Sequence, residues 1–566
     1  MSLLSTLSKD AAAAPTMTGG TAMLQSGPLD PAAESTAGAG ADVRAGQDMY
    51  FFTSIEDFPD DIGDLSLTHD DVQGFYEATA HITPPNGWYR DGEVGQWIYE
   101  ETYDNHLDEY GFDAARVVYH SGHGSMDDAG VFWLPVGNDW GGDFWTSSND
   151  MRLGNEHARY VFWSTCQSLR VKDGHDPIRT WSVANLGLRM IFGYETISYD
   201  NGNYGRFFFE EYNLGKSFST AFLDASWRIS TSQEPSVVAC GATQAEAQDR
   251  LFNEWQFHGD RADTTWWWWR WYDAARARAR NLLIPEGARS AKLAPAVVSR
   301  PEFAAFAARF DVGLPGDMDE TAMRRGIMLS GNGGTRIALG RNGSREVRLA
   351  QPADTRRQIS ADQAIAAAQQ AIEQYRLAQD VDLILDHVRY DRHAGASADE
   401  RAEAAVREVT VSFVQVIDGV PVVSPDSGRV HVRVDNDGTV TGIMDSTRQV
   451  QEVRDRAVVP PPPDTRRSRG PQAGPASAPS ENGVTGGMVT GVAAVDAALD
   501  AALQRRLRRI AAGGRVASGV RAVPNTTEVG YAMRDGDAVL VARREVEIDF
   551  GHGLAKRYAI EEPIVG

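Results

Sequence analysis

Short apolar runs alternate with polar and helical stretches between residue 49 and about residue 290, and this alternation constrains the fold more than any other feature. Four runs have the length of buried strands: residues 115–120, 160–164, 188–194 and 237–240. Residues 205–227 predict a helix, or two helices with a break at Gly215. Strands that alternate with helices are typical of a parallel sheet covered by helices. We therefore predict an α/β fold with a mostly parallel sheet and helices on both faces.

Composition divides the chain into five segments. Residues 1–47 are mostly Ala, Gly, Ser and Thr, so we expect a disordered arm that cannot bury enough apolar surface to fold. The aromatic-rich α/β domain follows over 48–290, and a region rich in Ala, Arg, Val and Asp covers 291–450. A linker rich in Pro, Gly and Ser over 451–488 then leads to a small α+β domain over 489–566.

Local signals predict the elements of the region 291–450. Ser360 and Gln363 form a capping box, which starts a helix. Residues 409–416 and 429–434 have the pattern of strands. The Asp-Asn-Asp-Gly sequence at 435–438 lacks the ligand spacing of a calcium loop and predicts a hairpin turn. These elements together indicate an α+β domain.

Residues 266–272 read Trp-Trp-Trp-Trp-Arg-Trp-Tyr. On a helix this run would place aromatic side chains on every face. One interpretation is a patch that binds a partner or a membrane interface. We favour a helix that packs between the α/β domain and the next domain.

Charge, cysteine count and hydropathy exclude several classes of protein. Lys and Arg number 55 and Asp and Glu 78, so the formal net charge is −23, which disfavours a nucleic-acid binder and favours cationic substrates or partners. Two cysteines cannot build a disulfide scaffold or a four-cysteine zinc site, so we expect no metal. We see no transmembrane run and no signal peptide, and expect a cytoplasmic protein by default, although non-classical export would leave no readable signal.

His123 and Cys166 are the residues that we expect to carry chemistry. His123 follows the apolar run 115–120 and the turn Ser121-Gly122, and Cys166 follows the next apolar run, 160–164. Consecutive parallel strands usually lie side by side with their carboxyl ends at one edge, which would bring the two side chains together. A nearby imidazole lowers the pKa of a thiol and can protonate a leaving amine. The backbone amides of Gly124 and Cys166 would face a developing oxyanion.

Other candidate residues have simpler explanations. Asp127 and Asp128, with Tyr194, are candidates for a substrate pocket, although solvated loop carboxylates explain the two aspartates more simply. We interpret His120 as a packing residue or a partner of the site, and Cys240 as a core residue.

The sequences YHSGHG and FWSTCQS resemble the motifs of the caspase-like cysteine peptidases, the group of caspases, legumain, gingipains, clostripain and separase. In that group an apolar strand precedes His-Gly, and a second apolar strand precedes a small residue and the nucleophilic Cys. The resemblance covers about residues 48–260, with Thr165 in place of the commoner Ala. It implies that His123 is the general acid/base, that Cys166 is the nucleophile and that no cofactor is needed. The aromatic-rich setting suggests a divergent branch.

Residues 413–443 resemble the propeptide modules of thermolysin-type proteases, the PepSY class. The sequence Gly-Val-Pro-Val at 419–422 and Asp437-Gly438 carry the resemblance, and the last unit is a candidate second, degenerate copy. Such modules inhibit their protease or assist its folding. We therefore expect an intramolecular contact between the catalytic and C-terminal domains, with a regulatory or substrate-presenting role. A plain α+β packing domain is the alternative.

Together these features predict a cysteine endopeptidase that acts on peptides or proteins and carries regulatory or inhibitory C-terminal modules. A catalytically inactive scaffold or protein-binding protein with the same fold is the main alternative. A transferase or amidase that uses the same pair of residues is a third.

Overall fold

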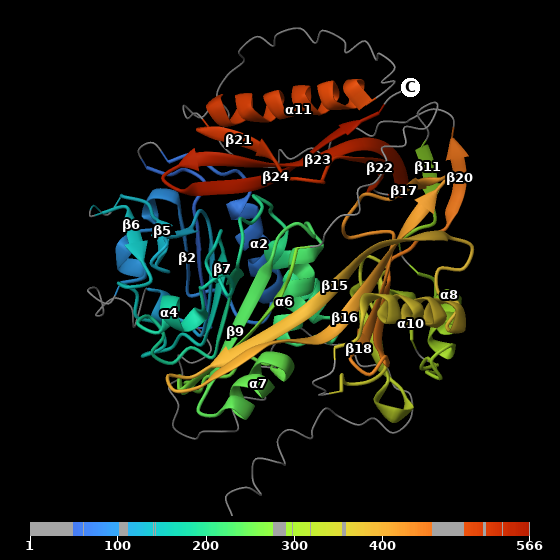
Figure 1. Cartoon of the computed structure of the whole chain (residues 1–566), viewed down its shortest axis with the longest axis horizontal. Coiled ribbons are helices and arrows are strands. Elements are labelled where there is room, and N and C mark those ends of the chain that lie inside the picture. Colours follow the sequence, from blue (N-terminus) through green and yellow to red (C-terminus); the bar gives the residue numbers. More distant parts are fainter. Residues whose placement is uncertain are drawn as a thin grey trace, which may run out of the picture.

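The computed structural model describes residues 49–59, 62–100, 111–139, 141, 143–274, 290–296, 298–316, 318–353, 358–454, 492–512, 517–534 and 536–564 (Figure 1). The predicted arm over 1–47 and most of the predicted linker lie outside the described residues. The first residues of that linker belong to a strand, β20 (Val450–Arg454).

Five neighbouring strands of the first sheet are parallel. They lie in the order β2 (Gly87–Arg90), β1 (Tyr50–Ser54), β3 (Val117–Ser121), β7 (Tyr160–Ser164) and β8 (Met190–Tyr194). All residues of the last four are buried, because both faces of the sheet are covered, which explains their continuous apolar sequences. The strands predicted at 115–120, 160–164 and 188–194 are confirmed to within two residues.

The two faces of this sheet have different covers. One face packs against the helices α2 (Thr68–Thr79), α5 (Tyr204–Tyr212), α6 (Phe218–Trp227) and α7 (Gln244–Asn253). The predicted break between α5 and α6 is confirmed, and Gly215 there has a φ of 80° that favours glycine. The other face packs against α4 (Pro177–Trp181) and a small sheet of β4 (Ser125–Met126), β5 (Phe132–Pro135) and β6 (Trp145–Ser147).

Beyond β8 the sheet becomes antiparallel, so the expected mostly parallel sheet exists only in its first five strands. β9 (Pro235–Gly241) is antiparallel to β8, and β10 (Trp266–Tyr272) is antiparallel to β9. The prediction of a helix over 266–272 is therefore wrong. Trp267 and Trp269 point into the core on one face of the sheet and Trp268 into the core on the other. A strand buried on both faces accepts an aromatic residue at every position, so the run shows no alternation.

The first sheet continues from β10 into strands of the region 291–450, which the sequence predicted to be a separate domain. β10 pairs with β15 (Asp382–Ala396), the first strand of a long hairpin that rises diagonally in Figure 1. The remaining strands follow β15 in antiparallel order: β16 (Arg401–Ile417), β18 (Arg429–Asp435), β19 (Val440–Asp445), β14 (Arg345–Arg348), β13 (Arg336–Leu339) and β12 (Ile327–Ser330), with β17 (Val420–Pro421) beside β16. The predicted hairpin turn joins β18 to β19.

Three helices accompany this antiparallel part: α8 (Arg300–Ala308), α9 (Glu320–Arg325) and α10 (Ala361–Gln374). The capping box of Ser360 and Gln363 is present at the start of α10. The helix and the strands predicted for the α+β unit are thus confirmed. The strands of this unit, however, belong to the same sheet as those of the preceding domain.

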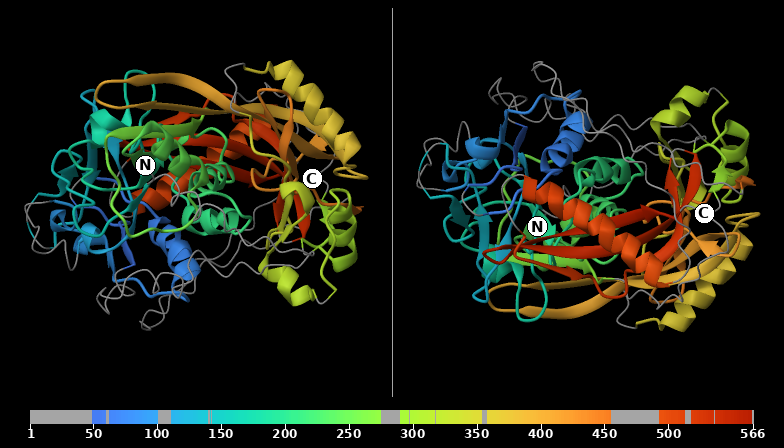
Figure 2. Two further views of the ribbon diagram at one scale, coloured as in Figure 1. Left: turned by 90° about the horizontal axis from the view of Figure 1, so that it is seen from below. Right: turned by 90° about the horizontal axis from the view of Figure 1, so that it is seen from above.

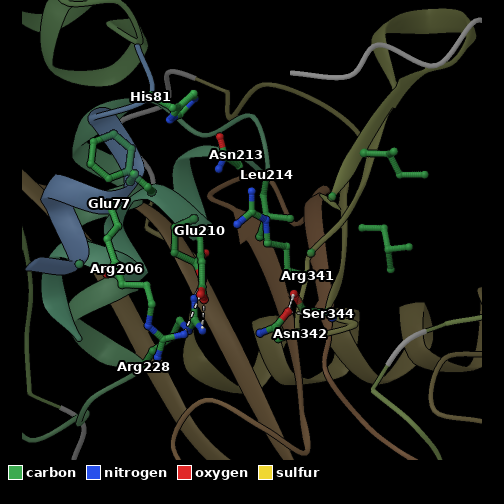
Figure 3. A pocket seen from close by; sticks show the side chains of 18 residues that line it. Glu77, His81, Arg206, Glu210, Asn213, Leu214, Arg228, Arg341, Asn342 and Ser344 are labelled. Atoms are coloured by element: carbon green, nitrogen blue, oxygen red, sulfur yellow. Dashed lines mark hydrogen bonds and ion pairs between the residues drawn. The ribbon is translucent and has the colours of Figure 1, made fainter. Parts of the chain in front are cut away.

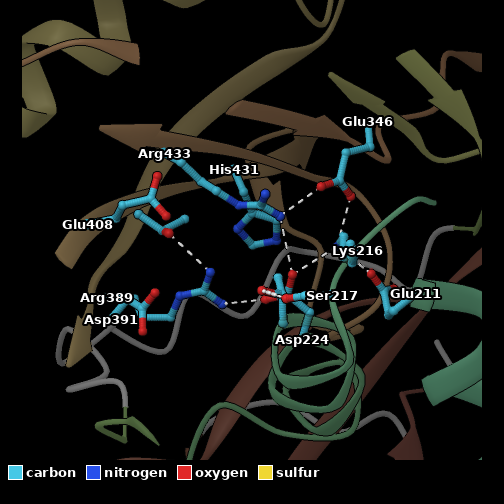
Figure 4. Close-up of polar contacts among 12 residues, drawn as sticks. Glu211, Lys216, Ser217, Asp224, Glu346, Arg389, Asp391, Glu408, His431 and Arg433 are labelled. Carbon is cyan, nitrogen blue, oxygen red and sulfur yellow. Dashed lines mark hydrogen bonds and ion pairs between the residues drawn. The ribbon is translucent and has the colours of Figure 1, made fainter. Parts of the chain in front are cut away.

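A buried network of charges lies where α5 and α6 meet the antiparallel strands (Figure 4). The Lys216 ammonium contacts the carboxylates of Glu211, Asp224 and Glu346 at 2.5–2.8 Å, and Arg433 bridges Asp224 and Glu346. Burial opposes the charge of Lys216, but the three carboxylates outweigh it and raise its pKa. Because every charge is paired, the network holds the two parts in one orientation.

The C-terminal residues form a second sheet that lies across the end of the first domain. Its strands are β20, β11 (Ser290–Leu293), β23 (Asp537–Gly551) and β21 (Gly519–Ala522), with β22 (Glu528–Arg534) and β24 (Leu554–Pro563) also paired to β23. Helix α11 (Val492–Ala512) covers this sheet (Figure 2, right). The strands predicted at 538–543 and 545–550 form the single strand β23. In the part of the chain that the structure describes, no helix has both the length and the apolar composition that crossing a bilayer requires.

Candidate active site around Cys166

His123 and Cys166 follow neighbouring parallel strands and lie at the same edge of the sheet. Ser121 of β3 pairs with Ser164 of β7, and the Gly122 amide donates to the Ser164 carbonyl at 3.5 Å. A Cβ atom on Gly124 would lie 3.0 Å from the Cβ of Thr165. The loops that carry the two residues therefore touch, as the order of the strands in the sequence predicts.

His123 is oriented by a backbone carbonyl. Its Nε2 lies 2.9 Å from the carbonyl oxygen of Gly63, and its ring packs against Phe58 at a tilted angle of 51° with 4.9 Å between centroids. A carbonyl only accepts hydrogen bonds, so Nε2 carries the proton and Nδ1 carries a lone pair. Nδ1 is buried and has no hydrogen-bond partner among the described residues. His123 thus presents a base to its surroundings.

Cys166 is only 1% exposed, and its thiol is engaged by two segments. It donates to the carbonyl oxygen of Ala555 at 3.0 Å, and it accepts from the Ser198 amide at 3.3 Å. The Ser198 hydroxyl lies 3.5 Å from the sulfur. Among the described residues, the thiol therefore forms hydrogen bonds with Ser198 and with the C-terminal strand β24, and not with a histidine.

The turn at Cys166 is strained, and each of the two touching loops has one backbone amide without an acceptor among the described residues. Gln167 has a φ of 53°, a conformation that costs a residue with a side chain about 1 kcal/mol or more. Among the described residues, the amides of Gly124 and Cys166 are paired with no acceptor. A side chain on Gly124 would collide with Phe132, which explains the need for glycine. These amides lie on the two touching loops and have no acceptor among the described residues, so they are candidate donors to a tetrahedral oxyanion.

Lys556 is the residue of this site that sequence reasoning missed. It is 1% exposed, and its ammonium donates to the Ser198 hydroxyl at 3.0 Å. Burial lowers the pKa of both His120 and His123 to about 3, and the positive charge of Lys556 adds to the effect. Both imidazoles are consequently neutral at physiological pH. Lys556 itself lies on a strand near the C-terminus in which polar and apolar residues alternate, and nothing in the local sequence marks it as part of a site.

Two buried polar residues support the end of β3. His120 Nδ1 lies 2.9 Å from the Thr53 hydroxyl and 3.0 Å from the Tyr99 hydroxyl, in keeping with a packing residue. Asp71 of α2 accepts hydrogen bonds from Tyr119 and Ser121 of β3, each at 2.8 Å. Asp71 gave no signal in the sequence because its partners lie about 50 residues away.

The three residues predicted to line a substrate pocket are not part of the lining of the pocket beside Gln167. Asp127 accepts hydrogen bonds from the Trp133 indole and the Val131 amide, so it stabilises the turn between β4 and β5, and Asp128 is exposed. Tyr194 is fully buried in the aromatic core and contacts the Ser226 hydroxyl at 3.0 Å. The explanation of solvated loop carboxylates fits the two aspartates better. Cys240 is a core residue, and burial raises the pKa of its thiol to about 12.

Two pockets differ in their relation to Cys166. A pocket of about 430 Å³ adjoins the site, with Gln167 and Ile197 on one side and Ala555, Glu547 and Asp549 on the other. A second pocket, of about 250 Å³, shares no lining residue with it (Figure 3). There Arg206 and Arg228 both pair with Glu210, so these charges satisfy one another. The described residues contain no group of three side chains arranged to hold a metal ion.

Comparison with known proteins adds one finding. Residues 52–271 match the family described as a domain of unknown function, DUF6345. The DUF6345 region runs from within β1 to within β10, and so contains both His123 and Cys166. A search of curated proteins finds no match.

Proposed function

We propose that the protein is a cysteine peptidase whose His123 and Cys166 act from a caspase-like arrangement of parallel strands. The observation that carries the proposal is the buried, unpaired Nδ1 of His123, set on the loop that touches the loop of a thiol. The amides of Gly124 and Cys166 on the same two loops, which have no acceptor in the described part of the chain, support it. The five parallel strands from β2 to β8 agree with a caspase-like domain, with the antiparallel strands as additions to it.

The reaction follows from these groups. Nδ1 of His123 takes the proton of the Cys166 thiol, and the sulfur attacks the carbonyl carbon of a peptide bond. The amides of Gly124 and Cys166 donate to the oxyanion. The imidazolium then protonates the leaving nitrogen, the C–N bond breaks and a thioester forms. Water attacks the thioester while His123 accepts a proton from it. The C–S bond then breaks, the peptide leaves as a carboxylic acid, and the imidazolium returns the proton to the sulfur to restore the thiol.

One observation favours the alternative of an inactive scaffold. Cys166 and His123 are both fully buried, and a thiol that served only as core packing would be buried in the same way. The two functions differ in what they require, because a peptidase must expose the thiol to its substrate at least transiently.

Peptide hydrolysis by the full chain distinguishes them. A mixed peptide library would be incubated with wild type, Cys166→Ser, His123→Gln and the matched control Cys240→Ser, and the fragments identified by mass spectrometry. The same set would be measured in a Phe550→Ala background, which weakens the cover over His123. We expect hydrolysis to disappear with Cys166→Ser, to fall at least 100-fold with His123→Gln and to persist with Cys240→Ser. Equal release of fragments by wild type and Cys166→Ser, with and without Phe550→Ala, would refute the proposal that the protein is a cysteine peptidase.

A further inference from the structure

The thiol of Cys166 is covered by a hairpin from the far end of the chain. Cys166 and Ala555 are 389 residues apart in sequence, and Ala555 is the second residue of β24, close to the turn that joins β23 to β24. In that turn Gly551, His552 and Gly553 all have positive φ, which makes the hairpin tip narrow. Phe550 packs on the His123 ring, 5.1 Å between centroids. The tip of the hairpin thus closes over both residues of the site.

The covering segment is bound as an extended peptide. The Arg557 amide donates to the Ser198 carbonyl at 3.0 Å, and the Asp200 amide donates to the Arg557 carbonyl at 3.2 Å. Tyr199 and Arg557 form a parallel bridge between the two segments. Backbone pairing of this kind accepts any extended peptide, and pockets for the side chains then decide which sequence binds.

One side chain of the segment enters the site itself. The Lys556 ammonium lies buried on the Ser198 hydroxyl, near His120 and His123. Beyond this bond, Nε2 of His120 and Nδ1 of His123 are buried polar atoms without partners among the described residues. Burying an ammonium is costly unless the surroundings supply acceptors, so a site that holds Lys556 is adapted to a basic side chain. The net charge of −23 favours such ligands over the whole surface.

We propose that the site of the suggested peptidase receives an extended peptide with a basic side chain, and that residues 555–557 hold this place until the C-terminal hairpin leaves. This proposal rests on the proposed function only in assuming that a bound peptide is hydrolysed; the binding of the peptide and the blocking by the hairpin do not depend on it. The Ala555 oxygen accepts a hydrogen bond from the thiol, while the amides of Gly124 and Cys166 have no acceptor in the described part of the chain. The carbonyl is therefore not seated for attack, and the segment blocks the site without being cut.

Glu545 of β23 is the anchor that the test removes. It accepts hydrogen bonds from Tyr199, Ser230 and Ser232 of the DUF6345 region at 2.5–2.7 Å. Glu545→Ala would weaken the docking of the hairpin. Glu562→Ala is the matched control, because Glu562 lies on the same hairpin but, among the described residues, its side chain pairs with Arg505 near the surface and not with the DUF6345 region.

The first measurement is the rate at which iodoacetamide labels Cys166 in the full chain, with Cys240 as the reference for global unfolding. We expect labelling to be at least tenfold faster in Glu545→Ala than in wild type, and unchanged in Glu562→Ala. If Cys240 also becomes reactive, Arg557→Ala replaces the variant, since it removes contacts with Ser232 and Glu547 at the same docking surface. Equal labelling of Cys166 in wild type and in a folded docking variant would refute the proposal that the hairpin blocks the thiol. A chain fragment that ends at Ala555 would also refute it, because the covering segment would then be a cleaved substrate.

The second measurement tests the basic side chain. The peptide LAKRYA, which has the sequence of residues 554–559, should protect Cys166 of Glu545→Ala from labelling. The peptide LAMRYA, which keeps the length of the side chain and removes its charge, should need at least a tenfold higher concentration. Equal protection by both peptides would overturn the basic pocket. Neither measurement requires hydrolysis, so a chain that labels as expected but cleaves no peptide would refute the proposed function alone.

Discussion

Phe550 offers a direct measure of how firmly the hairpin closes the site. Its ring is buried, contacts the His123 ring and fills the space that a Cβ atom on Gly63 would enter. Truncation of a buried phenylalanine to alanine costs roughly 3–5 kcal/mol. If about 3 kcal/mol of this falls on the closed arrangement, the population with an open hairpin rises roughly 100-fold, since each 1.4 kcal/mol is a factor of ten.

The assay is the labelling of Cys166 by iodoacetamide at pH 7.5, followed by mass spectrometry, for wild type and Phe550→Ala. We expect the rate to rise roughly 100-fold while Cys240, which is reached only by wider unfolding, stays protected. Phe303→Ala is the matched control, because Phe303 is fully buried in the separate core around α8 and α10. That variant should lose stability without selective labelling of Cys166. An unchanged rate in Phe550→Ala, or an equal rise at both cysteines, would refute the reasoning.

Two further predictions concern stability, each measured by urea unfolding. Burial lowers the pKa of His123 to about 3, so folding favours the neutral imidazole, and this contribution is complete above pH 6.5 and lost as pH falls toward 3. Relative to His123→Gln, wild type should lose about 1.4 kcal/mol per pH unit between pH 6 and 4, and parallel curves would contradict this. Asp391→Ala leaves the buried Arg270 of β10 without its carboxylate partner and should lower the free energy of unfolding by about 3–5 kcal/mol. The double variant Arg270→Met with Asp391→Leu should lower it by less. An equal loss in the single and double variants would show that the pairing is unimportant.

Much of the first domain could be predicted because its signals are local. The strands β3, β7 and β8 are unbroken apolar runs bounded by polar residues, and the capping box at Ser360 and the glycine at 215 mark helix ends by their own chemistry. The run 266–272 has no polar position except Arg270, so neither a period of two nor one of 3.6 can be read from it. Its assignment as a strand depends on β9 and β15, which lie on either side.

The sequence by itself placed His123 and Cys166 together, because they end consecutive parallel strands and such strands are usually neighbours. Only the tertiary structure decided what surrounds them. Gly63 orients the imidazole, Ala555 meets the thiol and Lys556 enters the site, and each comes from a segment that is distant in sequence. Local patterns report which side chains a strand buries, but pairing between distant segments depends on the shape of the whole surface. That is the physical reason why the motif was readable in the sequence and its cover was not.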